Sequence, residues 1–474
     1  MKIPKKIKDV LKELEKNNFQ AFLVGGCVRD LLREMEPKDW DITTNATPEE
    51  IQKVFPDNFY ENNFGTVTVL GSIEITPFRT EAKYTDKRHP DKVDWARTIE
   101  EDLSRRDFTI NAIGLNSKLE VIDLFNGQDD LKNKIIRAVG NSKERFNEDA
   151  LRMMRAIRFS CVLNYNIEEE TSKAIKESAP LMKAVSQERI RDEFIKIIMS
   201  DKASEGIELL RIHGLLKYVV PELLEGYEVD QSKHHIYDCY QHSIFSLKYA
   251  VKQKFNNYVR IASLLHDIGK PKSKRGVGEK ATFYGHEVVG ARMTKKILER
   301  LKFPKKDIEK ITKLVRYHLF YYNVDEVTEA SVRKLVRKVG SDSIQELLQV
   351  RMADRIGSGV PKAEPYKLRH MKYIVEKSAK DPISVKMLKL NGEDIMKILK
   401  IKPSQKIGQV LDILLGLVLE EPKNNKKTFL KKEVERLGKL SEKELNLLAQ
   451  KSKDEKDKII TKEDTMTKSK YWLT

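Results

Sequence analysis

The sequence has few cysteines and no apolar run long enough to cross a bilayer. Only three of its 474 residues are cysteines, Cys27, Cys161 and Cys239, and they lie far apart. An odd and scattered set excludes a disulfide framework and favours a reducing compartment. The longest apolar stretch, residues 410–419, is too short for a membrane span and carries an aspartate. The lysine-rich first residues contain no apolar signal core, so we expect a soluble, cytoplasmic protein with no membrane partner.

Acidic residues are outnumbered, which indicates a polyanionic partner. The net charge is +17 and the isoelectric point is near 9.3. Residues 361–474 hold 27 Lys and Arg against 17 Asp and Glu, so more than half of the excess lies in the last quarter of the chain. Clustered positive charge is typical of proteins that bind nucleic acid. For any single lysine, however, a solvated position is the simpler interpretation.

The hydrophobic pattern changes near residue 147. Before it, short β-like runs at 20–24, 66–70 and 72–78 alternate with helical patterns. After it, the apolar residues recur with the helical period of 3.6. The pattern predicts an α/β head with a small mixed sheet and helices, followed by an all-α body. The charge-alternating residues 451–458 predict a solvated or frayed tail.

Two glycines and two aspartates near the N-terminus suggest a site for a metal-bound nucleotide. Gly25 and Gly26 end an apolar run, and glycine lets the backbone approach a ligand closely. Asp39 and Asp41 are one residue apart, so on a strand both carboxylates would point to the same face. Two convergent carboxylates suit Mg²⁺ that carries a nucleoside triphosphate. This arrangement fits nucleotidyl transfer.

Two later motifs fit the remaining parts of a nucleotide. Arg106 and Asp107 lie in an Arg-Arg-Asp run suited to phosphate and ribose, although a surface ion pair is the ordinary alternative. Asp149 and Arg152 would be i,i+3 neighbours on a helix. The aspartate would accept from the amine of cytosine or adenine, and uracil and guanine present a carbonyl instead. An exposed helical salt bridge is the alternative for this pair.

Taken in order, these motifs resemble the class II tRNA nucleotidyltransferases, which are the CCA-adding enzymes and their relatives, the bacterial poly(A) polymerases. The matching pieces run from Gly25 to about Glu193 and include Asp123–Gly127 and Glu188–Glu193. The resemblance implies that Asp39 and Asp41 are catalytic and hold Mg²⁺, and that protein side chains choose CTP or ATP. The implied nucleotide-binding set is Gly25, Gly26, Arg29, Arg106, Asp107, Asp149, Arg152, Arg155 and Arg158.

Details within the family favour full CCA addition to tRNA. Residues 64–69 resemble the CCA-adding form, and residues 79–95 resemble the loop needed for the final A. The chain departs from the family at Asp94-Trp95, where Glu-Phe is usual, and at Arg33-Glu34, where a leucine-glycine turn is usual. The alternatives are a poly(A) polymerase, a partial CC- or A-adding enzyme, or a phosphohydrolase whose head only binds nucleotide. A non-catalytic RNA-binding scaffold is a weaker alternative.

A second group of histidines and aspartates follows downstream. Neighbouring His and Asp at a helix end can bind one divalent metal, with distant His and Asp completing the shell. The group resembles the HD phosphohydrolases over residues 235–360 and implies cleavage of a phosphate ester, such as a 2′,3′-cyclic phosphate on tRNA. Its metal is unidentified. The predicted ligands are His242, His266, Asp267, His286, His318 and Asp354.

These expectations give five segments. Basic residues after about 380 would contact tRNA phosphates in a salt-dependent way. The segments are a nucleotidyltransferase head at 1–145, a nucleotide-selecting neck at 146–228, an HD domain at 229–370, a tRNA-binding body at 371–450 and a charged tail at 451–474.

Overall fold

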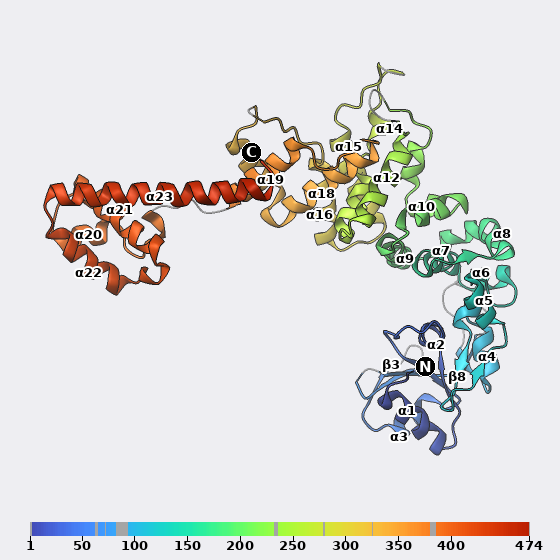
Figure 1. Cartoon of the computed structure of the whole chain (residues 1–474). Coiled ribbons are helices and arrows are strands. Elements are labelled where there is room, and N and C mark those ends of the chain that lie inside the picture. The colour runs from blue at the N-terminus through green and yellow to red at the C-terminus, as the bar shows by residue number, and fades with distance from the viewer. Residues whose placement is uncertain are drawn as a thin grey trace. The chain divides into compact units, whose positions relative to one another are not determined.

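The protein forms two compact units in its computed structural model, which describes residues 2–61, 65–71, 73–81, 93–231, 236–277, 280–324, 326–379 and 385–473. The first unit comprises residues 1–319 and 349–363, and the second comprises residues 320–348 and 364–474. Figure 1 labels their elements. The division differs from the boundary expected at residue 370, because α17 (Glu329–Val339) and α19 (Tyr366–Ala379) fall in the second unit.

The head is built on a seven-stranded sheet with the order β3-β4-β5-β2-β1-β8-β9. β2 and β5 are parallel and the other neighbours are antiparallel, which confirms the predicted mixed sheet. β1 (Ala21–Val24) is apolar and wholly buried, as expected for a central strand. The other strands are β2 (Asp41–Thr44), β3 (Asn58–Glu61), β4 (Thr66–Val69), β5 (Ile73–Pro77), β8 (Gly114–Leu115) and β9 (Val121–Ile122).

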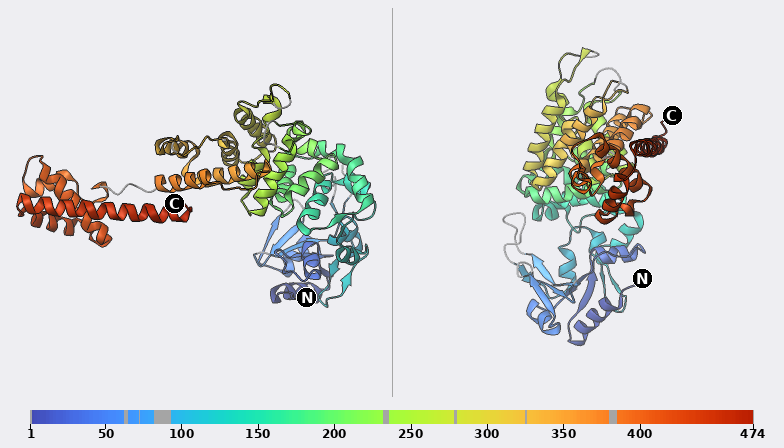
Figure 2. Two further views of the ribbon diagram at one scale, coloured as in Figure 1. Left: turned by 45° about the horizontal axis from the view of Figure 1, so that its top comes forward. Right: turned by 90° about the vertical axis from the view of Figure 1, so that its left-hand side faces the viewer.

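Helices cover the sheet and frame its edge (Figure 2, blue). α1 (Lys5–Lys16) buries Ile7, Val10, Leu11 and Leu14, which are spaced to form one apolar face. A hairpin of β6 (Arg79–Glu81) and β7 (Val93–Trp95) flanks the cluster of Phe22, Phe78 and Leu103. The remaining head helices are α2 (Gly26–Leu32), α3 (Pro48–Val54), α4 (Ile99–Ser104) and α5 (Gly127–Asn133).

Beyond the head the first unit is almost wholly helical, as predicted. A single short parallel pair, β10 (Ile135–Ile136) and β11 (Asn166–Ile167), interrupts the helices of the described chain here. The neck helices are α6 (Ser142–Glu148), α7 (Arg152–Leu163), α8 (Glu169–Ser178), α9 (Gln187–Met199), α10 (Ala203–Ile212) and α11 (Leu216–Val219). The following helices are α12 (Cys239–Lys252), α13 (Asn257–Leu265), α14 (Lys270–Ser273), α15 (His286–Arg300), α16 (Lys305–Tyr317) and α18 (Ser341–Gly357), of which residues 349–357 belong to this unit.

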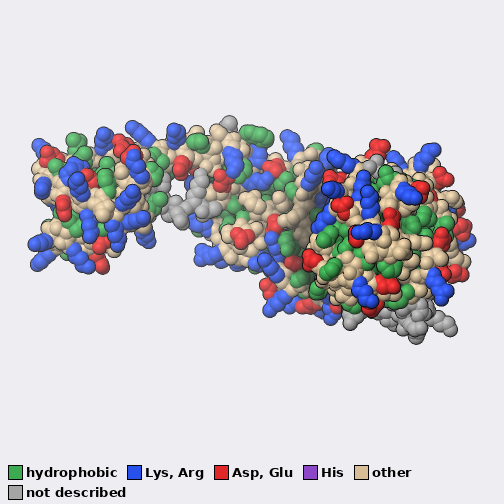
Figure 3. Space-filling view, turned by 90° about the horizontal axis from the view of Figure 1, so that it is seen from below, with side chains coloured by type: hydrophobic (Ala, Val, Ile, Leu, Met, Phe, Trp, Pro, Cys, Tyr) green, Lys and Arg blue, Asp and Glu red, His purple; other side chains and the backbone are tan. Residues whose placement is uncertain are grey.

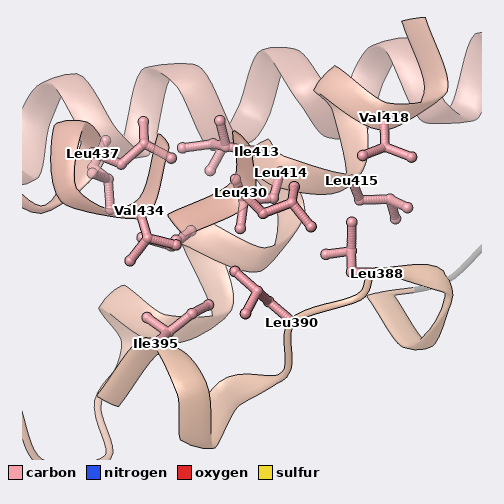
Figure 4. Packing of buried hydrophobic residues seen from close by; sticks show 13 residues of the cluster. Leu388, Leu390, Ile395, Ile413, Leu414, Leu415, Val418, Leu430, Val434 and Leu437 are labelled. Atoms are coloured by element: carbon pink, nitrogen blue, oxygen red, sulfur yellow. The ribbon is translucent and has the colours of Figure 1, made fainter. Parts of the chain in front are cut away.

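The second unit has a core of its own. Leu390, Ile395, Leu414, Leu430 and Val434 are among the buried side chains that pack together in Figure 4. They come from the segment before α20, from α20 itself and from the two helices after it. These helices are α20 (Gly392–Leu399), α21 (Gln405–Glu420) and α22 (Lys427–Gly438). Lys and Arg side chains stand on the surface of this region at the left end of Figure 3.

The prediction of a frayed tail is wrong, because the last residues continue a helix. α23 (Glu442–Lys470) is 29 residues long and unbroken (Figure 2, red). Ser441 and Glu444 form a capping box at its start, and alternating charges pair along it, as between Lys468 and Asp464 at 2.9 Å. Charges spaced three or four residues apart stabilise a helix. The charge pattern thus carried a helix signal.

Candidate functional site

The two predicted catalytic aspartates lie at the N-terminal end of β2. Asp41 is the first residue of the strand, and Asp39 lies in the bend before it. The expectation that both lie on one strand is therefore wrong for Asp39. Partial desolvation raises the pKa of Asp41, the Arg106 guanidinium opposes this, and the nearby Asp39 carboxylate adds to it. Two carboxylates close enough for one to disfavour the charge of the other supply oxygen donors that fit a site for Mg²⁺.

A small cavity opens beside Asp41. Its volume is about 270 Å³, and Asp41 faces Glu74 of β5 across the parallel register. Carboxylates from the sheet and arginines from the loop before β8 share its wall. The lining residues are Val24, Asp41, Ile42, Thr43, Thr66, Glu74, Thr76, Arg79, Arg105 and Arg106.

Gly25 lies close to both Asp41 of β2 and Arg106. Its φ of +75° is one that residues with a Cβ rarely adopt. A Cβ here would lie 3.0 Å from Arg106 Nη1 and 3.5 Å from Asp41 Oδ2. At Gly26 a Cβ would lie 3.7 Å from Arg29 Nη2. The pair therefore permits the close approach that the sequence predicted.

Three predicted arginines surround one aromatic ring. The guanidinium carbons of Arg29, Arg155 and Arg158 lie 5.6, 5.6 and 4.1 Å from the centre of the Phe159 ring. Arg29 also donates to Asn111 Oδ1 at 3.0 Å and pairs with Asp30. These contacts place the arginines by cation–π attraction as well as by hydrogen bonds.

A second cavity of about 240 Å³ adjoins the first through Arg105 and Arg106, which line both. Asp102 is fully buried and pairs with both arginines, at 2.7 and 3.0 Å. Asp102 was not predicted from the sequence, where its position one helical turn before Arg106 was the one indication of this pairing. The second cavity is lined by Arg105, Arg106, Asp107, Asp149, Arg152, Arg155 and Arg189.

Asp107 is anchored both from the neck and from within its own motif. Its Oδ2 accepts from Arg155 Nη2 at 2.5 Å, and its Oδ1 accepts from the backbone N–H of Phe108 at 2.9 Å. Burial alone would raise the pKa of Asp107, but Arg155, helped by Arg152 and Asn111, outweighs burial and lowers it to about 2. The run continues into Phe108 and Ile110, which are fully buried. The surface ion-pair alternative for this run is therefore wrong.

Asp149 and Arg152 do not share a helical face, which corrects the prediction. α6 ends at Glu148, Asp149 has extended backbone with φ −140° and ψ 101°, and α7 begins at Arg152. Asp149 accepts two hydrogen bonds from Arg189 of α9, at 3.1 and 2.8 Å. Arg152 donates to Glu148 at 2.6 Å and to the Arg105 carbonyl at 2.9 Å. The break between the helices brings both side chains into the second cavity.

α9 supplies two partners to which the sequence analysis gave no role. One is Arg189, and the other is Glu193, which is buried and forms an ion pair with Arg158, with 3.0 Å between Oε2 and Nε. Burial lowers the pKa of Arg158, and Glu193 opposes that shift. Arg158 is absent from the lining of the second cavity and lies against Phe159 instead. Both α9 residues belong to the family motif Glu188–Glu193, but their partners lie about 35–40 residues earlier in the sequence.

The predicted hairpin loop lies mostly outside the described residues, since residues 82–92 are among those not described. Its two ends pair in register, Arg79 with Trp95. A Cβ on Gly65 would lie 2.3 Å from the Trp95 ring, so the ring packs onto this glycine. Glu34 has a φ of +59° where the family usually has glycine, so the left-handed turn is kept.

The six predicted HD ligands meet at one point in the first unit. Asp267 Oδ2 lies 3.0 Å from His242 Nε2 and 3.3 Å from His266 Nε2. Asp267 Oδ1 lies 3.1 Å from His286 Nε2 and 3.5 Å from His318 Nε2. Asp354 Oδ1 lies 3.4 Å from His242 Nε2. All six residues are buried, and Asp267 is common to two groups of metal-binding geometry.

Backbone carbonyls orient three of these histidines. The Nδ1–H groups of His266, His286 and His318 donate to the carbonyls of Ser263, Phe283 and Val315 at 2.8, 2.7 and 2.7 Å. A carbonyl only accepts, so Nδ1 carries the proton and the Nε2 lone pair points into the cluster. Nitrogen and carboxylate donors held this way fit a transition metal or zinc.

Two cations stand behind the carboxylates of the cluster. Lys270 Nζ lies 2.6 Å from Asp267, and Arg351 Nη1 lies 2.5 Å from Asp354. Burial would lower the pKa of Lys270, but Asp267 raises it. A cavity of about 750 Å³ opens here, with Lys270, Arg351 and Arg355 among its lining residues. Asp267, Glu287 and Asp354 line the same cavity, so its three cations offer donors to a phosphate beside three carboxylates that can bind a metal.

Three family models match this chain. They are the poly A polymerase head domain at residues 21–137, the probable RNA and SrmB-binding site of polymerase A at 164–226, and the HD domain at 239–358. The resemblance predicted from the motifs is confirmed over these ranges. No helix among the described residues is long and apolar enough to span a membrane.

Curated relatives match the chain over part of its length. A CCA-adding enzyme of Lactobacillus helveticus is 50% identical over 204 residues, which cover 42% of this chain and 51% of that enzyme. A CCA-adding enzyme of Lactococcus lactis is 47% identical over 226 residues, which cover 46% and 56%. The chain thus spans about half the length of the curated relatives it matches.

Solved structures match most of the chain. The Bacillus stearothermophilus CCA-adding enzyme in complex with CTP has a TM-score of 0.59 and 25% identity, and the match covers 92% of this chain and 98% of that one. A Thermotoga maritima CCA-adding enzyme complexed with tRNA has a TM-score of 0.51, 19% identity and coverage of 91% and 95%, which shows the fold alone.

Proposed function

We propose that the chain is a member of the family of CCA-adding enzymes and poly(A) polymerases and acts as a CTP/ATP:tRNA nucleotidyltransferase, which adds or repairs the 3′-terminal CCA of tRNA. The observation that carries the proposal is the pair of adjoining cavities. One contains Asp41, the other contains Asp149 and Arg152, and both are lined by Arg106. One nucleoside triphosphate can thus present its phosphates to the carboxylates and its base to the neck.

In the proposed reaction the terminal 3′-oxygen of the tRNA bonds to the α-phosphorus of CTP or ATP, and the bond to pyrophosphate breaks. Asp39 and Asp41 would hold Mg²⁺, which would supply activation of the hydroxyl and positive charge beside the leaving oxygen. Gly25 allows the phosphates to approach the backbone, and Arg29 and Arg106 lie beside them. Arg155 keeps Asp107 ionised, so that its carboxylate can accept from a ribose hydroxyl.

Base choice would rest on Asp149 and Arg152. The carboxylate accepts from the exocyclic amine of cytosine or adenine, and the guanidinium donates to the adjacent ring nitrogen. Uracil and guanine would leave the partly buried carboxylate unmatched, at a cost of up to about 1–3 kcal/mol. No nucleic-acid template is needed.

The tRNA partner would be bound largely by charge. Lys423, Lys426, Lys427, Lys431 and Lys432 are exposed at and before the start of α22. Lysines that neutralise phosphates give an affinity that falls with salt and does not depend on sequence. We retain the head, neck, HD, body and C-terminal segments as the working domains of this activity.

The test is addition of single nucleotides to a tRNA trimmed of its 3′ end, with Mg²⁺ and with CTP and ATP alone and together. Two C followed by one A and then arrest would support the proposal. Arrest after CC would indicate a partial enzyme, and continued A addition a poly(A) polymerase. Addition that survives Asp39→Ala would overturn the assignment of the head.

We propose a second activity, metal-dependent phosphohydrolysis, for the HD cluster. The specific observation is the convergence of four histidines and two aspartates, with Asp267 offering a different oxygen to each of two groups. His242, His266, Asp267 and Asp354 could hold one divalent ion, and His286, His318 and the second oxygen of Asp267 another. A metal ion would supply an activated water, and Lys270 and Arg351 lie where they can stabilise a phosphate ester.

Metal content and hydrolysis test this second activity together. Purified protein is assayed for bound metal per chain and for release of phosphate from a 2′,3′-cyclic nucleotide or a nucleotide monoester. His266→Ala combined with Asp267→Ala should remove both and leave nucleotide addition unchanged. A wild-type chain that binds no divalent ion would overturn the proposal.

A further inference from the structure

Arg189 is the partner that fixes Asp149. It donates from Nη1 to Oδ1 at 3.1 Å and from Nη2 to Oδ2 at 2.8 Å, so the two groups form a bidentate pair. The side chains are 27% and 16% exposed, and both line the second cavity. Without Arg189, Asp149 would be held only by the backbone N–H of Leu151 on Oδ1, because it stands in the extended link between two helices. α9 supplies that constraint from 40 residues away.

The hydrogen bonds at Asp149 leave a defined acceptor. An ionised carboxylate has about four lone-pair sites and no donor. Oδ1 accepts from Arg189 and from the backbone N–H of Leu151 at 3.1 Å, which fills its two sites. Within the described part of the chain, Oδ2 accepts from Arg189 alone. The carboxylate therefore offers its remaining site on Oδ2, which suits a single N–H from a base.

We infer that Arg189 is a positioning residue for base selection: it turns Asp149 so that Oδ2 can accept from the amine of cytosine or adenine. The inference rests on the proposed nucleotidyl transfer and adds a residue that chooses the substrate without touching the reacting atoms. Without Arg189, Asp149 can rotate and pair with another of the cavity's arginines. The amine would then lose its fixed acceptor, and a carbonyl base would no longer meet a negative oxygen.

Loss of Arg189 should lower the discrimination between CTP and UTP more than it lowers the rate of nucleotide addition. We expect Arg189→Ala to lower the ratio of kcat/KM for CTP over UTP by about 10-fold or more, mainly through a higher KM for CTP. Arg189→Lys keeps the charge but not the fork, so it should restore only part of the ratio. Labelled CTP and UTP on a tRNA trimmed of CCA give both values.

Arg191 provides a matched control on the same helix. Its side chain is 21% exposed and pairs with Asp192 and the Lys302 carbonyl, outside the second cavity. Arg191→Ala should leave the CTP to UTP ratio unchanged. An active Arg189→Ala variant with the wild-type ratio, or an equal loss with both nucleotides, would overturn the inference alone. A wild-type chain that adds no nucleotide would overturn the proposed function as well.

Discussion

In the head and neck, two arginines are held by carboxylates from distant segments, whereas in the HD cluster three of the four histidines are held by backbone carbonyls three residues before them. Arg155 pairs with Asp107 across 48 residues, and Arg189 pairs with Asp149 across 40. His266 Nδ1, in contrast, bonds a carbonyl three residues before it. A pair between side chains can be broken by one substitution, whereas a bond to the backbone survives substitution of its neighbours. The nucleotide cavities should therefore be adjustable, and the metal cluster should be preformed.

Replacing Asp41 at the start of β2 should give the largest difference between the activity of the head and that of the HD cluster. Asp41→Asn should lower nucleotide addition by at least about 1000-fold, because the site loses a charge that holds the metal. Hydrolysis by the HD cluster should not change. Both rates can be measured on one preparation, and equal loss of both would show that the substitution unfolds the first unit.

Breaking the bridge of the HD cluster should have the next largest effect. Asp267→Asn removes a charge shared by both groups of ligands, so bound metal should fall to below one ion per chain and hydrolysis by about 100-fold or more. Elemental analysis of the purified variant checks the first value. Full metal occupancy with lost hydrolysis would contradict the assignment of Asp267 as a ligand.

The pair between Asp107 and Arg155 makes stability depend on pH. The carboxyl pKa falls from 3.8 to about 2, so its contribution is complete well above pH 4 and is lost as the pH falls toward 2. At pH 7 it corresponds to about 2 kcal/mol. Asp107→Asn should lower the free energy of unfolding by about that amount, measured with urea. The difference from the wild type should shrink between pH 5 and pH 3, and a constant difference would exclude this cause.

The contact at Gly25 should give the smallest effect. Gly25→Ala adds a methyl group 3.0 Å from Arg106 and strains a φ of +75°, so addition should fall about 10-fold. Gly214→Ala is the control, because Gly214 has a φ of +71° and open space around its Cβ position. Equal effects of the two substitutions on stability, with unequal effects on addition, would assign the difference to the Arg106 contact.

Local patterns predicted the elements well, and distant partners could not be predicted. The apolar run before Gly25 gave β1, and the six HD ligands came together as their residue types indicated. The break at Asp149 was missed because a run of good helix formers gives no sign that tertiary pairing with Arg189 holds one residue extended. Glu193 was missed for the same reason, since its partner Arg158 is 35 residues away. Asp102 is different, because its partners Arg105 and Arg106 lie within one helical turn and gave a local signal.

Helix α23 has a mechanical consequence. Its early turns pack closely on α21, where a Cβ on Gly416 would lie 2.8 Å from Ser452 Oγ. Its last turns are tied to α19 by the bonds of Lys470 and Tyr471 to Glu376. The span from Ser452 to Lys470 is about 27 Å at 1.5 Å per residue. A continuous helix resists bending. A small tilt of α23 at its contact with Gly416 would therefore displace the end of the helix at Lys470 by a larger distance.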